Sequence, residues 1–205
     1  MALQIVIPGT FTAPGLPDLG MLGFVDTFSR GNSTTSMGYT ETPRREWTYG
    51  PPGAGVVSGI RAGQAYVARS TGVGFATATV DAEVADGTLE GTIGTHVTIS
   101  GAQLGLAFRH ASTNDMWRFV KVQEAFYRLT KVAGGTNTNV ADSEGITPAM
   151  GDRLRVVLNG PSITCYVNDQ LAVQTTDTFN AAVTWHGIVN NNTTDNTMDN
   201  VSFTA

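Results

Sequence analysis

The sequence feature that most constrains the fold is an alternation of apolar and polar residues between residues 153 and 173. The runs RLRVVLN and SITCYV place an apolar residue at every second position, a period of two that a helix would scramble. Turn-forming residues, Asn-Gly-Pro at 159–161 and Asn-Asp at 168–169, separate the runs. The pattern predicts a three-stranded antiparallel meander whose inward-facing side chains are Leu154, Val156, Leu158, Ile163, Cys165, Val167, Leu171 and Val173.

Similar short runs recur along the rest of the chain, separated by Gly, Asn and Asp at the spacing typical of an antiparallel sandwich. Residues 73–80 and 89–99, which include Val97 and Ile99, are expected to form long kinked strands. In QLGLAFRH, Leu104, Leu106 and Phe108 share one face, and DMWRFVKV and FYRLTKV are expected to pair across a turn near residues 123–125. No window predicts a helix. We therefore predict an all-β, antiparallel two-sheet sandwich over residues 21–205.

Residues 1–20 have a different character. They contain three prolines and one short apolar run, in which Leu3, Ile5 and Ile7 alternate. A segment of this kind cannot bury its own apolar groups and needs either the domain's own sheet or a neighbour's surface. We predict an extended N-terminal arm that serves assembly.

Charge and composition exclude several classes of function. Twelve basic and seventeen acidic residues give a net charge of −5, which disfavours nucleic-acid binding. No apolar run reaches the length of a membrane span, so membrane insertion is not expected. The single Cys165 cannot form an internal disulfide, and its place in an alternating run predicts a buried, inert thiol.

Several segments, in this order, resemble those of a known family: DTFSRGNSTTSMG, GLAFRHASTNDMWRFVKV, FYRLTKVAGG, GDRLRVVLNGPSITCYVNDQ and the terminal MDNVSF. Together they span most of residues 24–204. The chain resembles the concanavalin A-like (laminin G-like) jelly-roll domains, and more narrowly those in minor tail proteins of phages that infect actinobacteria. The resemblance implies a jelly roll, a fold used in virion structural proteins, sugar-binding modules and some glycosidases, so it leaves the function open.

The first of these segments holds two charged residues that could be catalytic or structural. Phe24, Val25 and Phe28 are expected on the first strand, and Asp26 and Arg30 are close enough to pair or to hold the following loop. The loop GNSTTSMG is rich in hydroxyl groups that can satisfy its own backbone. We interpret Asp26 and Arg30 as fold-defining rather than catalytic.

The sequence lacks the carboxylate pattern of a glycosidase. Retaining enzymes of this architecture use Glu-x-Asp-x-Glu on one strand face. The nearest approach, Glu83, Asp86 and Glu90, mixes faces and is better explained by solvated charges at strand ends. No nucleophile elbow or phosphate loop is present. We therefore predict that the protein is not an enzyme.

No metal or other cofactor is expected. The three histidines lack metal-site spacing, and each is interpreted as a packed or surface imidazole: His96, His110 and His186. Sandwich domains often hold calcium at loop ends, and Asn/Asp-rich loops occur at 114–115 and 190–199. Such loops are mostly turns, so calcium is not expected.

Carbohydrate recognition usually combines an aromatic platform with fixed polar groups. The candidate ligand-binding residues are Trp117, Tyr127 and Trp185 as aromatics, with Arg109 and His186 as polar neighbours. Arg118 and Arg128 lie near them in the sequence.

For Trp117 two readings stay open. In DMWRFVKV, Trp117, Phe119 and Lys121 share a face. Either this row is exposed and Trp117 forms the platform, or Trp117 and Phe119 fill the core and Lys121 extends its amine to the edge.

The function predicted from these observations is that of a non-enzymatic phage virion protein, a minor tail or tail-tip component made in the host cytoplasm. The arm would attach to other virion subunits, and the sandwich would adhere to host-envelope glycan. Several copies, as a homo-oligomer in the particle, would raise weak contacts to useful avidity. The alternatives are capsid decoration, a carbohydrate-binding module or accessory module of a secreted glycosidase, and a diverged glycoside hydrolase.

Overall fold

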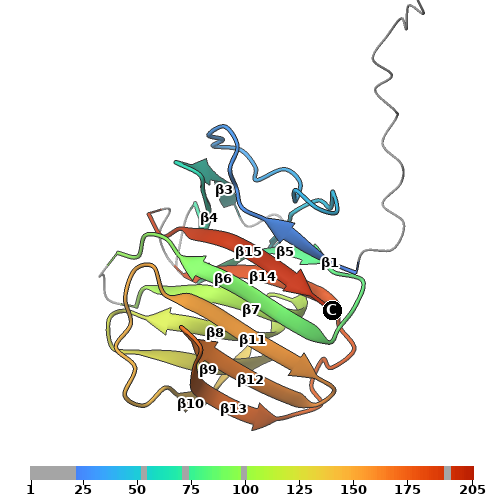
Figure 1. Cartoon of the computed structure of the whole chain (residues 1–205), viewed down its shortest axis with the longest axis vertical. Coiled ribbons are helices and arrows are strands. Elements are labelled where there is room, and N and C mark those ends of the chain that lie inside the picture. Colours follow the sequence, from blue (N-terminus) through green and yellow to red (C-terminus); the bar gives the residue numbers. More distant parts are fainter. Residues whose placement is uncertain (1–21, 52–54, 71–73, 98–100, 192–194) are drawn as a thin grey trace, which may run out of the picture.

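Two antiparallel β-sheets packed face to face form the described part of the chain (Figure 1). The computed structural model describes residues 22–51, 55–70, 74–97, 101–191 and 195–205. These residues form fifteen strands, and no helix occurs among them, so none that could span a membrane is found there. The prediction of an all-β, antiparallel two-sheet sandwich is confirmed.

The larger sheet has eight strands in the order β13-β12-β11-β6-β15-β4-β3, with β1 also paired to β15. All of its strand pairs are antiparallel. Its strands are β1 (Gly23–Asp26), β3 (Val56–Arg61), β4 (Gln64–Arg69), β6 (Gly87–Ile93), β11 (Arg153–Asn159), β12 (Ser162–Val167), β13 (Gln170–Thr176) and β15 (Met198–Thr204).

The second sheet has seven strands in the order β10-β9-β8-β7-β14-β5-β2, again all antiparallel. Strands distant in the sequence lie side by side, since β14 lies between β7 and β5. Its strands are β2 (Thr48–Gly50), β5 (Phe75–Asp81), β7 (Gln103–Ser112), β8 (Asp115–Val122), β9 (Phe126–Ala133), β10 (Thr136–Asp142) and β14 (Trp185–Asn191).

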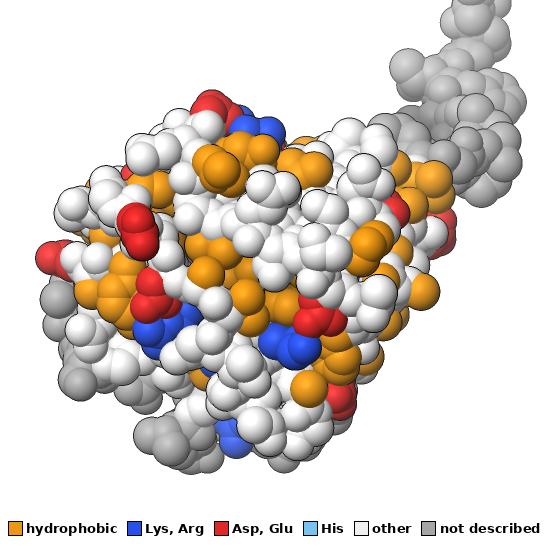
Figure 2. All heavy atoms as spheres, turned by 90° about the horizontal axis from the view of Figure 1, so that it is seen from below, with side chains coloured by type: hydrophobic (Ala, Val, Ile, Leu, Met, Phe, Trp, Pro, Cys, Tyr) orange, Lys and Arg blue, Asp and Glu red, His pale blue; other side chains and the backbone are white. Residues whose placement is uncertain are grey.

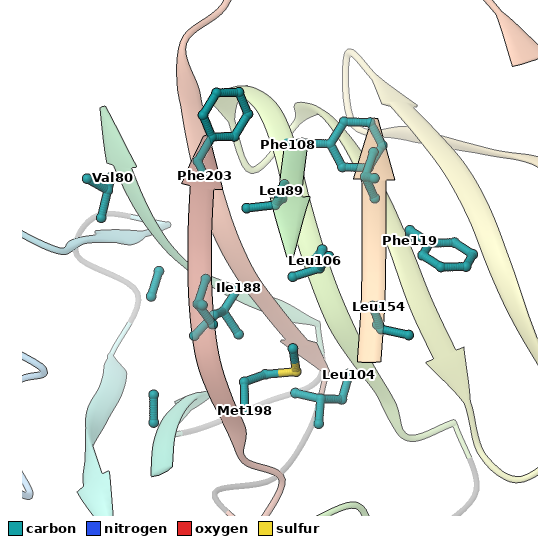
Figure 3. Close-up of a cluster of buried hydrophobic side chains, with 14 of the residues drawn as sticks. Val80, Leu89, Leu104, Leu106, Phe108, Phe119, Leu154, Ile188, Met198 and Phe203 are labelled. Carbon is teal, nitrogen blue, oxygen red and sulfur yellow. The ribbon is translucent and has the colours of Figure 1, made fainter. Parts of the chain in front are cut away.

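The hydrophobic core fills the space between the two sheets. Alternate residues of each strand point inward, and removing this apolar surface from water is the main favourable term in folding. Side chains from both sheets meet in the centre (Figure 3), among them Leu89, Leu154 and Phe203 of the larger sheet with Leu106 and Ile188 of the smaller one. The predicted shared face of Leu104, Leu106 and Phe108 is confirmed.

The predicted meander is present as β11, β12 and β13, with turns at both expected places. One of its inward assignments is wrong. A register shift between Cys165 and Tyr166 aligns Leu171 with Tyr166 rather than with the inward-facing Val167. Leu171 therefore lies on the outer face and is 53% exposed, whereas Val173, opposite Cys165, stays in the core. Burial raises the pKa of the Cys165 thiol, in line with an inert side chain.

Two further predictions differ from the structure or fall outside it. The long strand expected over residues 89–99 ends at Ile93, and Val97 follows in irregular structure. Ile99 lies outside the described residues. The predicted arm, with its apolar residues Leu3, Ile5 and Ile7, also lies outside them.

Asp26 is the last residue of β1, and its carboxylate accepts hydrogen bonds from three residues. Its side chain is 0% exposed. Arg30 donates to both carboxylate oxygens, over 2.5 and 2.8 Å, and the indole Nε1 of Trp47 donates to Oδ2 over 2.7 Å. The amide of Phe28 donates to Oδ1 over 2.9 Å. The predicted Asp26–Arg30 pair is thus confirmed, and it also satisfies the indole of a core tryptophan.

The loop after β1 is held in the predicted way. Arg30 donates to the carbonyl of Met37, and the Oγ atoms of Ser33 and Ser36 accept backbone amides of their own loop. The placement of Phe28 on the first strand is wrong, because β1 ends at Asp26. Phe28 has a φ of 54° and turns its ring back into the core.

Charged side chains are dispersed over the face of the molecule shown in Figure 2. On this face, most Lys and Arg side chains lie beside Asp or Glu, and no continuous basic patch is visible. Ion pairs link Arg128 to Asp142 and Lys131 to Asp177. Such a surface offers a phosphate backbone no extended attraction.

Replacing Asp26 by Ala is expected to lower the free energy of unfolding by about 3 kcal/mol, because Arg30 loses its carboxylate partner and the buried Trp47 Nε1 loses its acceptor. Urea denaturation followed by tryptophan fluorescence measures this change. The matched control is Glu46→Ala, an exposed carboxylate, with a change below about 0.5 kcal/mol. Equal stability of the two variants would contradict the structural role of Asp26.

Candidate functional site

A groove of about 400 Å³ lies on the outer face of the seven-stranded sheet, over β2, β5, β7 and β14. It is called the Trp185 groove below. The residues that line it include one tryptophan, one histidine and several residues with hydroxyl groups: Thr48, Tyr49, Gly50, Thr79, His110, Ala111, Ser112, Thr113 and Trp185.

Strand alternation explains how these side chains reach the outer face. In β5, Ala78 and Val80 point into the core, so Thr79 between them points outward. In β14, His186 stacks on the core residue Phe203, with ring centroids 4.1 Å apart, so Trp185 points the other way. The outward row of β5 thus supplies hydroxyl groups, and the first residue of β14 supplies the indole.

Strand β7 contributes to the groove through an irregularity. Its register with β8 shifts between Phe108 and Ser112, and Arg109 in this interval has a φ of 47°. The shift turns Arg109 into the interior and brings His110 to the outer face, where its Nε2 lies 3.1 Å from Oγ1 of Thr77. Burial lowers the pKa of His110 to about 4, so its imidazole is neutral at pH 7.

The floor of the groove leaves no room for a side chain at position 50, where the chain has a glycine. A Cβ atom there would lie 2.8 Å from Oγ1 of Thr77 and 3.0 Å from Cγ2 of Thr113. The hydroxyl of Tyr49 is engaged elsewhere, accepting the amide of Met37 over 2.8 Å. Tyr49 lies opposite the core residue Ala78, so its ring packs against the core and only its edge of the strand borders the groove. The hydroxyl of Ser112 is also engaged, since it donates to Asp115 and accepts the amide of Asn114, which leaves the threonines as the hydroxyl groups for a ligand.

No Asp, Glu, Lys or Arg occurs among the described residues that line the Trp185 groove. A neutral imidazole, hydroxyl groups and the indole ring of Trp185 suit a neutral ligand with apolar faces and polar edges. With no carboxylate in the lining, the described groove offers no acid–base pair for hydrolysis.

The aromatic platform expected around Trp117 is wrong, and the core reading of that row is confirmed. Trp117 is 0% exposed, stacks on Phe108 at 6.4 Å and donates its Nε1–H to the carbonyl of Phe179 over 3.1 Å. Phe119 is buried beside it in the same core. Lys121, at the end of the row, is also buried, and burial lowers the pKa of its amine.

Tyr127 and Arg109, two more predicted binding residues, are interior as well. The Tyr127 hydroxyl donates to Asp152, and burial together with this bond raises the pKa of the phenol. Arg109 is 0% exposed, and its Nη2 reaches Asp86 over 3.2 Å and the carbonyl of Gly160. Since Asp86 and Gly160 flank strands of the opposite sheet, Arg109 ties the two sheets together rather than facing a ligand.

His186 is likewise a core residue. It is fully buried against Phe203, its Nδ1 accepts the amide of Arg109 over 3.4 Å, and its Nε2 lies 3.3 Å from the carbonyl of Val84. Burial is the main reason that its pKa falls to about 3. Of the five predicted binding residues, only Trp185 lines the outer groove.

The three carboxylates considered for hydrolysis are separated, and each has an arginine partner. Glu83 pairs with Arg45, Asp86 with Arg109, and Glu90 with Arg153 and Arg155. Glu83 and Asp86 lie between β5 and β6, as their interpretation as charges at strand ends predicts, whereas Glu90 lies within β6 and does not fit it.

Among residues 22–205, outside the gaps in the description, no group of three or more His, Cys, Asp or Glu side chains could hold a metal ion. In the loop considered for calcium, Asn190 is buried and donates to the carbonyl of Val67, and Asn196 donates to Asn190. These two amides support the loop from inside. His96 is also buried, and burial lowers its pKa to about 4.

Sequence reasoning missed most of the groove. Thr48, Tyr49 and Thr79 are ordinary strand residues in the sequence, and they meet only because β2 and β14 both pair with β5. His110 was interpreted as a packed or surface imidazole. Its side chain faces the groove because the register of β7 with β8 is irregular, and the regular alternation in QLGLAFRH gives no sign of this irregularity.

The architecture matches solved structures over nearly its whole length. The carbohydrate recognition domain of Emp47p superposes with a TM-score of 0.55 at 9% identity, covering 89% of this chain and 94% of that one. LamAcat from Zobellia galactanivorans gives 0.52 at 10% identity, covering 92% and 98%. The fold is a concanavalin A-like jelly roll.

A third structure of this jelly-roll fold is the κ-carrageenase from Pseudoalteromonas carrageenovora in complex with an oligotetrasaccharide of κ-carrageenan. Its TM-score is 0.50 at 11% identity, covering 94% of this chain and 98% of that one. No family model and no curated protein sequence matches the chain. These likenesses establish the fold.

The buried histidines predict a loss of stability in acid. His186 has a folded pKa of about 3, below its unfolded value of about 6.5, so the stability that it contributes is complete above pH 6.5 and is lost as the pH falls toward 3. His186→Gln should reduce the slope of unfolding free energy against pH between 6.5 and 4, by up to about 1.4 kcal/mol per pH unit. Urea denaturation at several pH values measures the slope, and an unchanged slope would contradict the assignment.

Proposed function

We propose that this jelly roll is a carbohydrate-binding domain whose ligand lies in the Trp185 groove. The observation that carries the proposal is the composition of the groove, in which Trp185 stands beside hydroxyl groups and a neutral His110 without a charged side chain in the described lining. Sugar rings present C–H faces that pack on aromatic rings and hydroxyl edges that exchange hydrogen bonds, which this lining complements.

The fold comparison supports the same class of ligand. A carbohydrate recognition domain and a carrageenase bound to its oligosaccharide share this architecture. Because one fold serves many functions, the support comes from the groove and the fold together.

We propose binding without hydrolysis. A retaining glycosidase needs two carboxyl groups about 5 Å apart at the bound sugar. The acidic side chains considered for that role, Glu83, Asp86 and Glu90, are held by arginines, and none of them lines the groove.

Replacing Trp185 by Ala should weaken binding of a neutral oligosaccharide at least about tenfold, or about 1.4 kcal/mol, because the packing surface for the sugar is lost. Cello-, laminari- and galacto-oligosaccharides on a glycan array, followed by calorimetry on the best binder, measure the change. The free energy of unfolding should stay within about 0.5 kcal/mol of the original.

Trp117→Ala is the matched control, since it removes a second indole from the same sheet, but from its core face. It should lower the free energy of unfolding by about 3 to 5 kcal/mol. Binding unchanged in the Trp185 variant, or no binding of any array member by the original protein, would overturn the proposed function.

For the biological setting we propose a phage virion, in which the sandwich adheres to host-envelope glycan as part of a minor tail component. The support is the resemblance of segments such as DTFSRGNSTTSMG and the terminal MDNVSF to phage tail domains. Several copies around a symmetric tail would multiply a weak contact in the groove. A carbohydrate-binding module of a secreted glycosidase would use the same groove in a different setting.

Deleting residues 1–20 separates these two settings. In a virion protein that uses the arm for assembly, the truncated chain should fold and bind saccharide normally but fail to enter particles. Circular dichroism, the array and electron microscopy of particles grown with the truncated gene measure the three properties. A truncated chain that unfolds, or that still enters particles, would refute the assembly role of the arm.

A further inference from the structure

A second, smaller pocket of about 280 Å³ lies beside the Trp185 groove and differs from it in charge. It is called the Arg118 pocket below. Two arginines from different sheets line it together with polar side chains, and the described lining contains no Asp or Glu: Pro51, Arg69, Phe75, Thr113, Asn114, Arg118, Val132, Gly135 and Asn137.

Arg118 is an unusual cation because it is buried and, within the part of the chain that the structure describes, forms no ion pair with a carboxylate. It is 4% exposed, and its guanidinium lies 3.5 Å from the centroid of the Phe75 ring. Nη2 donates to Oδ1 of Asn137 over 3.0 Å, but Nε and Nη1 have no acceptor among the described residues. Buried polar groups in native proteins are nearly always satisfied, so these two nitrogens need an explanation.

The charges around Arg118 also indicate that its guanidinium lacks an anionic partner in the described ranges of the chain. Burial is the main reason that its pKa falls to about 10, and the nearby positive charge of Arg128 lowers it further. Arg128 pairs with Asp142 at 2.6 Å, so the carboxylate of Asp142 is already engaged by another arginine. Arg69, half-buried at the same pocket, also has its Nε without an acceptor in the described part of the chain.

The Arg118 pocket and the Trp185 groove adjoin each other. Thr113 lines both, and the consecutive residues Gly50 and Pro51 line one each. A chain molecule that occupies both would place an uncharged unit against Trp185 and a neighbouring unit against the two arginines.

We propose that the Arg118 pocket binds the acidic group of a saccharide, a carboxylate or a sulfate ester, next to a neutral sugar in the Trp185 groove. This inference rests on the proposed function and narrows its ligand to acidic glycans. Guanidinium groups match the planar carboxylate and the sulfate oxygens, and an acid in the pocket would give the free nitrogens of Arg69 and Arg118 their acceptors.

A nucleic acid does not fit the same observations. Its binding needs several phosphate contacts along a basic track, whereas the adjoining groove has no cation in its described lining and the protein carries a net charge of −5. One local positive site on an acidic protein instead favours a polymer with sparse, regularly placed charges.

The test compares three probes on the full chain by calorimetry: hyaluronan oligosaccharide, which alternates a carboxylate sugar with a neutral one, κ-carrageenan oligosaccharide for sulfate esters, and a neutral galacto-oligosaccharide. At least one acidic probe should bind at least about tenfold more tightly than the neutral one. Raising NaCl from about 0.05 to about 0.5 M should weaken the acidic probe more than the neutral one.

Arg69→Gln and Arg118→Gln should each remove this preference and leave neutral binding unchanged. Arg44→Gln is the matched control, because it removes one positive charge from an exposed arginine that stacks on Tyr39, away from both pockets. If Arg118→Gln fails to fold, the half-buried Arg69 decides the result.

The outcomes separate the two proposals. Equal binding of acidic and neutral probes through Trp185, or an acidic preference that survives in Arg69→Gln, would overturn the acidic-glycan inference and leave the groove proposal standing. No binding of any probe would overturn both.

Discussion

The packing of β1 and β2 depends on the ion pair and the hydrogen bonds of the Asp26 carboxylate. This carboxylate is buried where β1 ends, and it is acceptable there only because Arg30 neutralises it and two further donors saturate its oxygens. One of those donors is the indole of Trp47, the residue directly before β2. The same contact that closes the first loop therefore anchors the strand that forms one wall of the Trp185 groove.

The two faces of the seven-stranded sheet have separate roles. Its inner face contributes Trp117, Phe119 and Tyr127 to the core. Its outer face carries a neutral aromatic groove at one place and an arginine pocket beside it. Under the proposed function, the two sites together would distinguish ligands by the spacing between a neutral unit and an acid, which neither site would do alone.

The fold was predictable because alternation and turn chemistry are local. The meander of β11, β12 and β13 was recognisable from its residues, and so was the pairing of Asp26 with Arg30. Errors occurred where a strand departs from regular register. The shift between Cys165 and Tyr166 exposes Leu171, and the shift within β7 turns Arg109 inward.

The sequence by itself determined the all-β class, the strands with the strongest alternation and the absence of a basic surface. These depend only on residue types and on the recurrence of apolar residues at every second position. Only the tertiary structure decided which aromatic residues lie in the core and which line the outer groove. Trp117 and Trp185 are equivalent as residue types, but strand order places one between the sheets and the other beside Thr79 and His110. Long-range pairing decides this, since a strand does not encode which of its two faces will be covered.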